Sequence, residues 1–120
     1  MLEPTSSARV VITTVVSTEE ANRIGRILIE ERLAACATLL PQIHSIYRWH
    51  DQIESSAETM LLFKTSLDQL PALETRLREL HSYQTPEFLV LPVESGSHAY
   101  LDWLQASLTC THPEEKRPKS

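Results

Sequence analysis

Hydrophobic and polar residues follow two different periods at the start of the chain. Val10 to Val16 is almost entirely β-branched, which predicts a buried strand. Ser17 and Glu20 then have the spacing of a helix-capping box. Apolar residues recur at helical spacing as far as Ala35, with polar residues largely opposite them. The sequence therefore predicts a strand that leads directly into a helix ending near Ala35.

The next apolar segment predicts a long β-hairpin. Ala37 to Leu40 begins a strand, Pro41 interrupts it, and Ile43 to His50 continues it. Asp51-Gln52 is a plausible turn, after which Ile53 to Thr65 forms the returning arm. The two arms together predict an extended hairpin in the middle of the chain.

The second half of the chain repeats the alternation of helix and strand. A leucine stripe predicts a helix from about Asp68 to His81, and Glu87 to Val93 predicts a fourth strand. Pro92 suggests an edge position or the end of that strand, and a last helix begins near Ser97. The order β-α-β-β-α-β plus a C-terminal helix predicts an α+β, ferredoxin-like fold, with both main helices on one face of an antiparallel sheet.

Length and composition indicate a single domain. A chain of 120 residues can bury a core without disulfides or metal. We expect the ferredoxin-like domain to span 8–109. Residues 1–7 are small and polar and are predicted to form a disordered arm. Residues 110–120 are charged and contain proline, so we expect a disordered tail.

The predicted hairpin is longer than a compact domain of this size. A straight strand from Cys36 to His50 would span roughly 50 Å, whereas the domain should be about 35 Å across. The projecting tip carries Tyr47 and Trp49, and such aromatic groups are favoured in the cores of interfaces. We therefore predict self-association through the hairpin. The alternative is a hairpin that folds back on its own sheet.

Charge and cysteine content exclude several classes of protein. The net charge of −5 gives no electrostatic footprint for nucleic acid or anionic lipid, and no apolar run is long enough for a membrane span. Two glycines are too few for a glycine-rich phosphate loop. We see no export signal, and Cys36 and Cys110 form no close pair, so we expect a cytoplasmic protein. Cys36 is expected to pack as a small apolar residue.

Several motifs occur in order along the chain. They are ERLAAC at Glu31–Cys36, SIYRW at Ser45–Trp49, Lys64-Thr65, HSYQTPE at His81–Glu87 and G-x-x-x-Y-L-x-W at Gly96–Trp103. Together they resemble the CutA divalent-cation-tolerance family over about Val10 to Leu108. The resemblance implies a homotrimer of ferredoxin-like protomers, similar to PII signalling proteins. It also implies a link to tolerance of copper and other divalent cations.

The chain departs from the family pattern at positions that bear on metal binding. In some bacterial relatives a cysteine and a His-His pair have been taken as copper ligands. The matching positions here hold Thr14, Leu80 and His81, so His81 is the one remaining candidate metal ligand. Ser82 stands where the family often has proline. We expect no certain cofactor, and copper binding that is weak or scattered over histidines.

Seven residues form the candidate ligand site that the sequence predicts. They are Tyr47, Trp49, Glu58, Lys64, Tyr83, Glu87 and Trp103. One interpretation is that the aromatic rings pack a trimer interface and the charges pair at its edge. The other is a polar-lined cleft between subunits that holds a small ligand. Lys64 lies in an apolar run and is expected to have a carboxylate partner such as Glu58 or Glu87.

The predicted function is that of a homotrimeric cytoplasmic protein in copper and heavy-metal tolerance, binding a metal or a small ligand. The alternative is a PII-like regulatory module that binds a metabolite between subunits and a partner protein. An enzyme with an active site between subunits is a third hypothesis. The sequence has no nucleophile elbow and no H-E-x-x-H motif, so we predict a protein that is not an enzyme.

Overall fold

The computed structural model describes residues 1–109, and the tail predicted at 110–120 lies outside this range. The elements are β1 (Leu2–Pro4), β2 (Ala8–Val15), α1 (Thr18–Glu30), β3 (Cys36–Trp49), β4 (Gln52–Ser66), the 3-10 helix η1 (Leu67–Gln69), α2 (Leu70–Leu80), β5 (Leu89–Pro92), β6 (Ser95–Ser97) and α3 (His98–Ser107). None of the helices in this range is long and apolar enough to cross a membrane.

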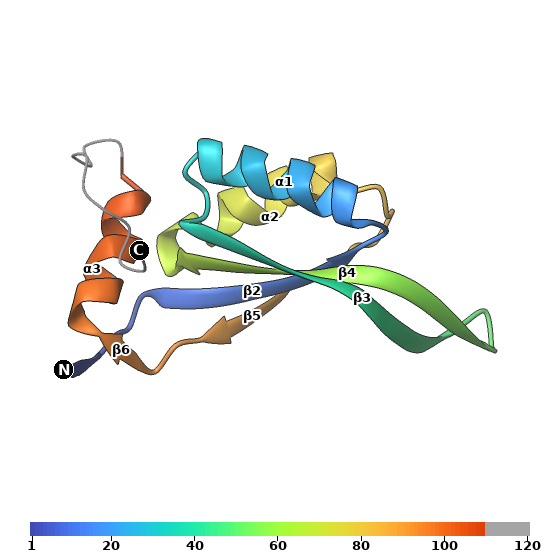
Figure 1. The fold of residues 1–120 in the computed structure, drawn as a ribbon, viewed down its shortest axis with the longest axis horizontal. Coiled ribbons are helices and arrows are strands. Elements are labelled where there is room, and N and C mark those ends of the chain that lie inside the picture. Colours follow the sequence, from blue (N-terminus) through green and yellow to red (C-terminus); the bar gives the residue numbers. More distant parts are fainter. Residues whose placement is uncertain (110–120) are drawn as a thin grey trace.

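The main sheet is antiparallel and has four strands in the order β3-β4-β2-β5. Both α1 and α2 lie on the same face of this sheet, as Figure 1 shows. This arrangement confirms the predicted α+β, ferredoxin-like fold. Pro92 ends β5, which is an edge strand of the sheet, as the sequence predicts.

The hydrophobic core fills the space between the sheet and these two helices. Alternate residues of β2 and β4, such as Val11 and Phe63, point toward the helices and are fully buried. Leu28 from α1 and Leu77 from α2 meet them in the same cluster. Burying each side chain of this size stabilises the fold by about 1.5–3 kcal/mol. This face of β4 thus packs in the core, and neither α1 nor α2 covers its other face.

Helix α1 begins where the sequence predicts and ends earlier. The Ser17 hydroxyl accepts a hydrogen bond from the backbone N–H of Glu20 over 3.1 Å, which confirms the N-cap. The helix ends at Glu30 rather than near Ala35, because Arg32 takes a φ of 59° and the chain reverses there. Its last turn closes when Leu33 N–H donates to Leu28 O over 3.0 Å. Ala35 lies in the loop after the helix and is buried as well. For this reason the apolar spacing continues beyond the end of the helix.

Strand β3 runs through the proline that was expected to interrupt it. The pairing with β4 shifts between Leu40 and Ile43, which is a β-bulge, and Gln42 there has a φ of 60°. At the tip, His50 and Asp51 have φ angles of 50° and 63°. Two such residues between paired strands form a tight hairpin turn, one position earlier than predicted.

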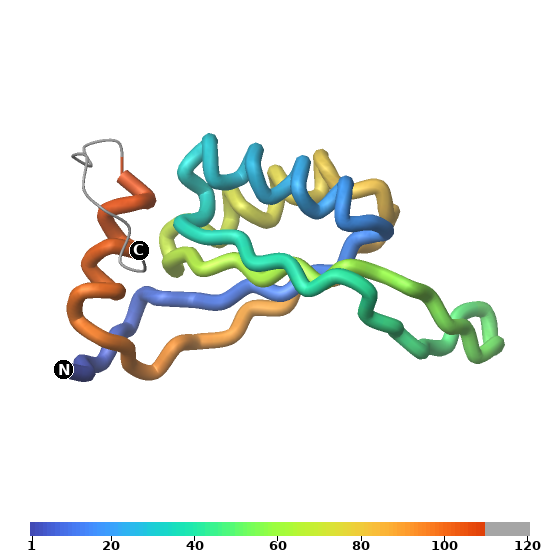
Figure 2. Tube along the Cα trace, viewed as in Figure 1, coloured from blue at the N-terminus to red at the C-terminus, as the bar shows by residue number. Residues whose placement is uncertain are grey.

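The hairpin of β3 and β4 extends well beyond the rest of the sheet. The molecule measures 48 × 28 × 26 Å, and its long axis follows this hairpin, whose tip lies opposite the N-terminus in Figure 2. The predicted projection is therefore confirmed, and a fold-back of the hairpin on its own sheet is not seen.

The N-terminal residues differ from the disordered arm predicted for 1–7. Leu2, Glu3 and Pro4 form β1, which pairs with β6 in a separate two-stranded sheet. His98 N–H also donates to Met1 O over 3.1 Å. The pairing uses backbone groups, which the side-chain pattern does not reveal. As a result, the start of the chain is tied to the beginning of α3.

Candidate functional site

A groove of about 790 Å³ lies along the projecting hairpin. It is lined by Thr14, Ser45, Ile46, Tyr47, Trp49, Glu54, Ser56, Glu58, Tyr83, Thr85 and Glu87. The hairpin provides one side, and the loop between α2 and β5 provides the other. Of the residues predicted for a ligand site, Tyr47, Trp49, Glu58, Tyr83 and Glu87 meet here, whereas Lys64 and Trp103 lie elsewhere.

A hydrogen bond across the groove joins its two sides. The Tyr83 hydroxyl donates to Glu58 Oε2 over 2.6 Å, and Glu58 is only 8% exposed. Burial, together with the bond to Glu58, raises the pKa of Tyr83, so the phenol keeps its proton and acts as a donor. Glu87 lies nearby, and its pKa is raised by burial and by the charge of Glu58. The groove therefore holds two carboxyl groups that repel each other.

His81 fixes the turn that brings Tyr83 into the groove. Its ring is buried, Nε2–H donates to Thr14 O over 2.8 Å, and Nδ1 accepts from the backbone N–H of Tyr83 over 3.0 Å. These two bonds assign the proton to Nε2, because a carbonyl oxygen can only accept. Both ring nitrogens are thus in use. The predicted role of His81 as a metal ligand would require one of these bonds to break.

Glu20 anchors the same turn, and the sequence did not identify it as a site residue. Its carboxylate accepts from Ser82 N–H over 3.0 Å and from the Ser82 hydroxyl over 2.9 Å. The capping-box spacing assigned this side chain to the N-terminal cap of α1, but only the backbone of Glu20 serves that cap. Ser82 therefore secures the turn by hydrogen bonds. Nothing in the local spacing predicts a contact between residues so far apart in the chain.

Aromatic rings form the outer part of the groove. Tyr47 and Ser56 share a hydrogen bond of 2.8 Å between their hydroxyl groups, and Tyr47 lies opposite Glu54 in the strand pairing. Trp49 is 59% exposed, and its ring and the His50 ring form a T-shaped pair at a centroid distance of 4.9 Å. The two aromatic faces are therefore open to a ligand or to another subunit.

Lys64 has different partners from those predicted. Its Nζ donates to the Thr38 hydroxyl over 3.3 Å and lies 3.8 Å from the Cys36 sulfur. Within residues 1–109 it forms no ion pair, so the expected carboxylate partner was wrong. The register explains this, because Lys64 lies opposite Cys36, whereas Glu58 lies opposite Ile43 on the far side of the bulge.

Trp103 belongs to a small cluster at the opposite end of the molecule. Its ring contacts Tyr100 at a centroid distance of 5.5 Å, beside buried Ala35, Leu104 and Leu108. Its position on α3 keeps it away from the projecting hairpin (Figure 1). Trp103 therefore packs α3 against the domain and does not line the groove.

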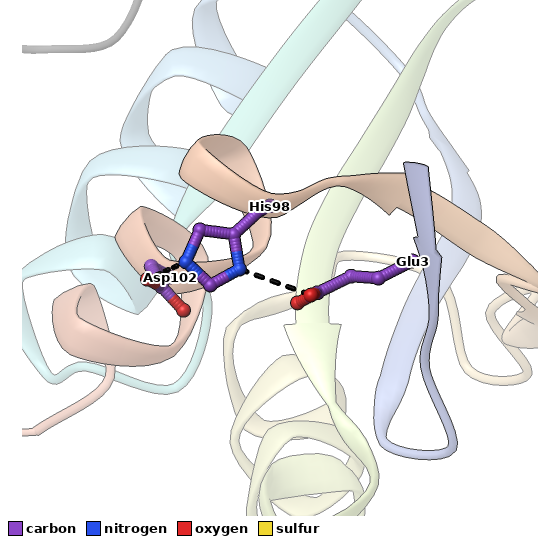
Figure 3. Close-up of side chains that lie close together, drawn as sticks. All are labelled: Glu3, His98 and Asp102. Carbon is purple, nitrogen blue, oxygen red and sulfur yellow. Dashed lines mark hydrogen bonds and ion pairs between the residues drawn. The ribbon is translucent and has the colours of Figure 1, made fainter. Parts of the chain in front are cut away.

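A second cluster of titratable groups connects β1 with α3. His98 Nδ1 lies 3.0 Å from Glu3 Oε2, and His98 Nε2 lies 3.1 Å from Asp102 Oδ2, as Figure 3 shows. The bond to Glu3, followed by the charges of Asp102 and Glu3, raises the pKa of His98. In the described part of the chain, these are the one group of three potential metal ligands within 4.8 Å of one another. All three side chains are well exposed to water.

Comparison with known proteins links this chain and its fold to one family. Residues 9–107 match the family described as CutA1 divalent ion tolerance protein. The divalent-cation tolerance protein CutA of Thermus thermophilus is 45% identical over 96 residues, which cover 80% of this chain and 93% of the relative.

Solved structures agree with this match. CutA from Synechococcus elongatus superposes with a TM-score of 0.88 at 40% identity, covering 91% of this chain and 96% of that one. The same protein has also been solved in complex with a Bis-Tris molecule. A structure from Archaeoglobus fulgidus, described as a periplasmic divalent cation tolerance protein CutA, has a TM-score of 0.83 at 32% identity and covers 85% of this chain and 99% of that one.

Proposed function

This chain belongs to the CutA1 divalent ion tolerance protein family, and we propose that it acts in divalent-cation tolerance as a homotrimer that binds a small ligand. The observation that carries the proposal is the groove, in which buried Glu58 and half-buried Tyr83 form a hydrogen bond beside the exposed rings of Tyr47 and Trp49. Ligand pockets typically combine apolar and aromatic walls with a few placed polar groups. The groove has this composition.

The polar groups of the groove fit binding better than catalysis. Tyr83 keeps its proton because its pKa is raised, and that proton is directed to Glu58. A general base or nucleophile needs a group poised to lose or share a proton with substrate at the working pH. We therefore propose a protein that is not an enzyme, with a site that recognises its ligand by shape and charge.

A small molecule is a better candidate than a tightly held copper ion. Both nitrogens of His81 are engaged, and Thr14 contributes only its backbone carbonyl to that contact. The Synechococcus relative is described in complex with Bis-Tris, a small organic molecule, which supports the same use of the fold here. In this proposal the protein responds to divalent cations indirectly, and any copper that it binds is weakly held.

Self-association is proposed to occur through the projecting hairpin and the open side of the sheet. Ile46 and Ile53 are 74% and 66% exposed on the hairpin, and β5 exposes Leu89 and Leu91 at an edge of the sheet. Apolar side chains on an unpaired edge are stabilised when a neighbouring subunit covers them. A homotrimer, the assembly implied by the family resemblance, would cover both regions.

A PII-like regulatory module is the second candidate function. The tip of the hairpin favours it, because Trp49 and Ile53 are exposed beside the turn at His50 and Asp51, where a partner protein could reach them. The same groove would then hold a metabolite that controls partner binding. The two candidates differ in whether the assembled trimer needs a second protein to act.

We place the protein in the cytoplasm, and the free thiol of Cys36 supports this location. Relatives need not share one compartment, since the Archaeoglobus protein is described as periplasmic. Fractionation of the source cells, followed by detection with a specific antibody, tests the assignment. Recovery of the protein in the periplasmic or membrane fraction would contradict it.

Two measurements test the proposed function. Native mass spectrometry of protein purified without affinity metal should report a trimer and any retained small molecule. Growth of a deletion strain on graded copper, complemented with the wild type or with Glu58→Gln, should show that tolerance depends on the groove. A monomer without retained ligand, together with equal growth of all strains, would contradict the proposal.

A further inference from the structure

We infer that the groove selects small organic ammonium ions over neutral or anionic molecules of the same shape. This inference rests on the proposed ligand-binding function and names the class of ligand. Three independent features of the groove support it: its charge, its aromatic walls and the spacing of its carboxylates.

The charge of the groove is negative and has no counter-charge in its walls. Glu54, Glu58 and Glu87 line it, and no lysine or arginine is found among the described lining residues. Arg48 is close in sequence, but it is not among the residues that line the groove. An anionic ligand would therefore meet like charges without a compensating partner.

The carboxylates retain acceptor capacity for a cation. Glu58 is buried and uses Oε2 to accept from Tyr83, while a carboxylate can accept several further hydrogen bonds. Glu87 is half-buried beside it, and the charge of Glu58 opposes the ionisation of Glu87. A cation between them would relieve this repulsion, which an uncharged ligand cannot do.

The aromatic walls suit the organic part of such a cation. Tyr47 and Trp49 expose their rings at the outer end of the groove, and Tyr83 contributes a third ring deeper inside. The face of an aromatic ring attracts an ammonium group that lies within about 6 Å of the ring centre. Methylene or methyl groups on the same ligand would cover the apolar ring surface and displace water from it.

The spacing of the carboxylates argues against a bare metal ion at this place. Calcium and magnesium need several oxygen ligands at about 2.0–2.6 Å. Glu54, Glu58 and Glu87 do not form a group with ligand atoms within 4.8 Å of one another, whereas the described residues Glu3, His98 and Asp102 do. A groove of about 790 Å³ with separated carboxylates fits a larger cation whose charge is spread over several atoms.

The experiment compares choline with its neutral isostere 3,3-dimethyl-1-butanol and with the anion 3,3-dimethylbutanoate. Binding is measured by calorimetry and by Trp49 fluorescence in a Trp103→Phe background, using the full chain in its native assembly. We expect choline to bind saturably and at least tenfold more tightly than either of the other probes. Glu54→Gln and Glu58→Gln should each weaken choline binding, and Glu74→Gln on α2 is the matched control that should not.

Two outcomes would overturn the inference, and they differ in what they imply for the proposed function. If the neutral or anionic probe binds as tightly as choline, and Tyr83→Phe weakens that binding, the groove binds ligands but does not select cations. If no probe, including choline, binds saturably at 10 mM, the cation inference fails. In that case a small molecule that is retained in native mass spectrometry and lost in Glu58→Gln would still support ligand binding in the groove. Glu54 is exposed, so its variant tests charge without disturbing the buried pair.

Discussion

The hydroxyl of Tyr83 and the carboxylate of Glu58 lie 2.6 Å apart, and this contact joins the α2–β5 loop to strand β4. Tyr83→Phe removes the hydroxyl donor and leaves the buried carboxylate of Glu58 without this hydrogen bond. We expect the free energy of unfolding to fall by about 1–3 kcal/mol, measured by urea denaturation at fixed protein concentration. Tyr47→Phe is the control, since its bond to Ser56 is exposed and should contribute less. Equal losses in both variants would contradict a special role for the buried pair.

The turn after α2 should depend on Ser82 as a hydrogen-bond donor. Ser82→Ala removes one of the two bonds to Glu20, and Ser82→Pro removes both. Because Glu20 is only 9% exposed, each lost bond should lower the free energy of unfolding by about 1–3 kcal/mol, with proline the more severe change. Thr75→Ala on the exposed side of α2 is the control. A proline variant as stable as the wild type would show that the turn does not need these bonds.

Assembly should weaken when the aromatic side chain at the hairpin tip is removed. We expect sedimentation equilibrium to report a trimer for the wild type, and Trp49→Ala to dissociate at higher protein concentration. An aromatic residue at the centre of an interface often contributes more than about 2 kcal/mol. Arg78→Ala on α2, far from the hairpin, should leave the equilibrium unchanged. A wild-type chain that stays monomeric at micromolar concentration would exclude this mode of association.

The sequence predicted the elements better than their ends and their contacts. The β-branched run of β2 and the leucine stripe of α2 have clear periods, and both elements were found. The end of α1 was missed because the chain reverses at Arg32, where no glycine marks the left-handed conformation. Strand β1 was also missed, because its pairing with β6 uses backbone groups and leaves no pattern in the side chains.

The residues of the candidate site were predicted only in part, because side-chain contacts depend on strand register and helix packing. Glu58 and Tyr83 were among the seven candidate residues, and the fold brings them together. Lys64 was assigned a carboxylate partner because its charge is conspicuous in an apolar strand, but the register with β3 decides what it meets. The contact of Glu20 with Ser82 depends on how α1 and α2 pack, which no local pattern contains.

The link between β1 and α3 should loosen as pH rises. The pKa of His98 is raised in the folded protein, mainly by the bond to Glu3 and then by the charge of Asp102, while the N-terminal amino group of Met1 opposes the shift. The stabilisation is therefore complete below the ordinary histidine pKa and is lost as pH rises through the raised value. An NMR titration should place the pKa of His98 above the ordinary histidine value, and Glu3→Gln should lower that pKa and reduce amide protection in β1. An unchanged pKa in Glu3→Gln would contradict this assignment.

Copper should bind weakly and without a defined site at His81. We expect calorimetric titration to give no tight site with one metal per subunit, because both nitrogens of His81 are held in the folded chain. His98→Ala should reduce the weak binding, since His98 is exposed beside two carboxylates. His81→Ala should not reduce it. A tight site that disappears in His81→Ala would show that the turn opens to admit metal.

The pairing of β1 with β6 sets an order of events during synthesis. Leu2 lies opposite Ser97, so β1 is synthesised well before its partner β6. Until then its backbone groups are open to water, and the nascent chain can form the β3–β4 hairpin first, because that contact is local. A fusion partner at the N-terminus would sit beside β6 and α3 and could hinder this last step. Recombinant protein intended for binding measurements is therefore better made without an N-terminal tag.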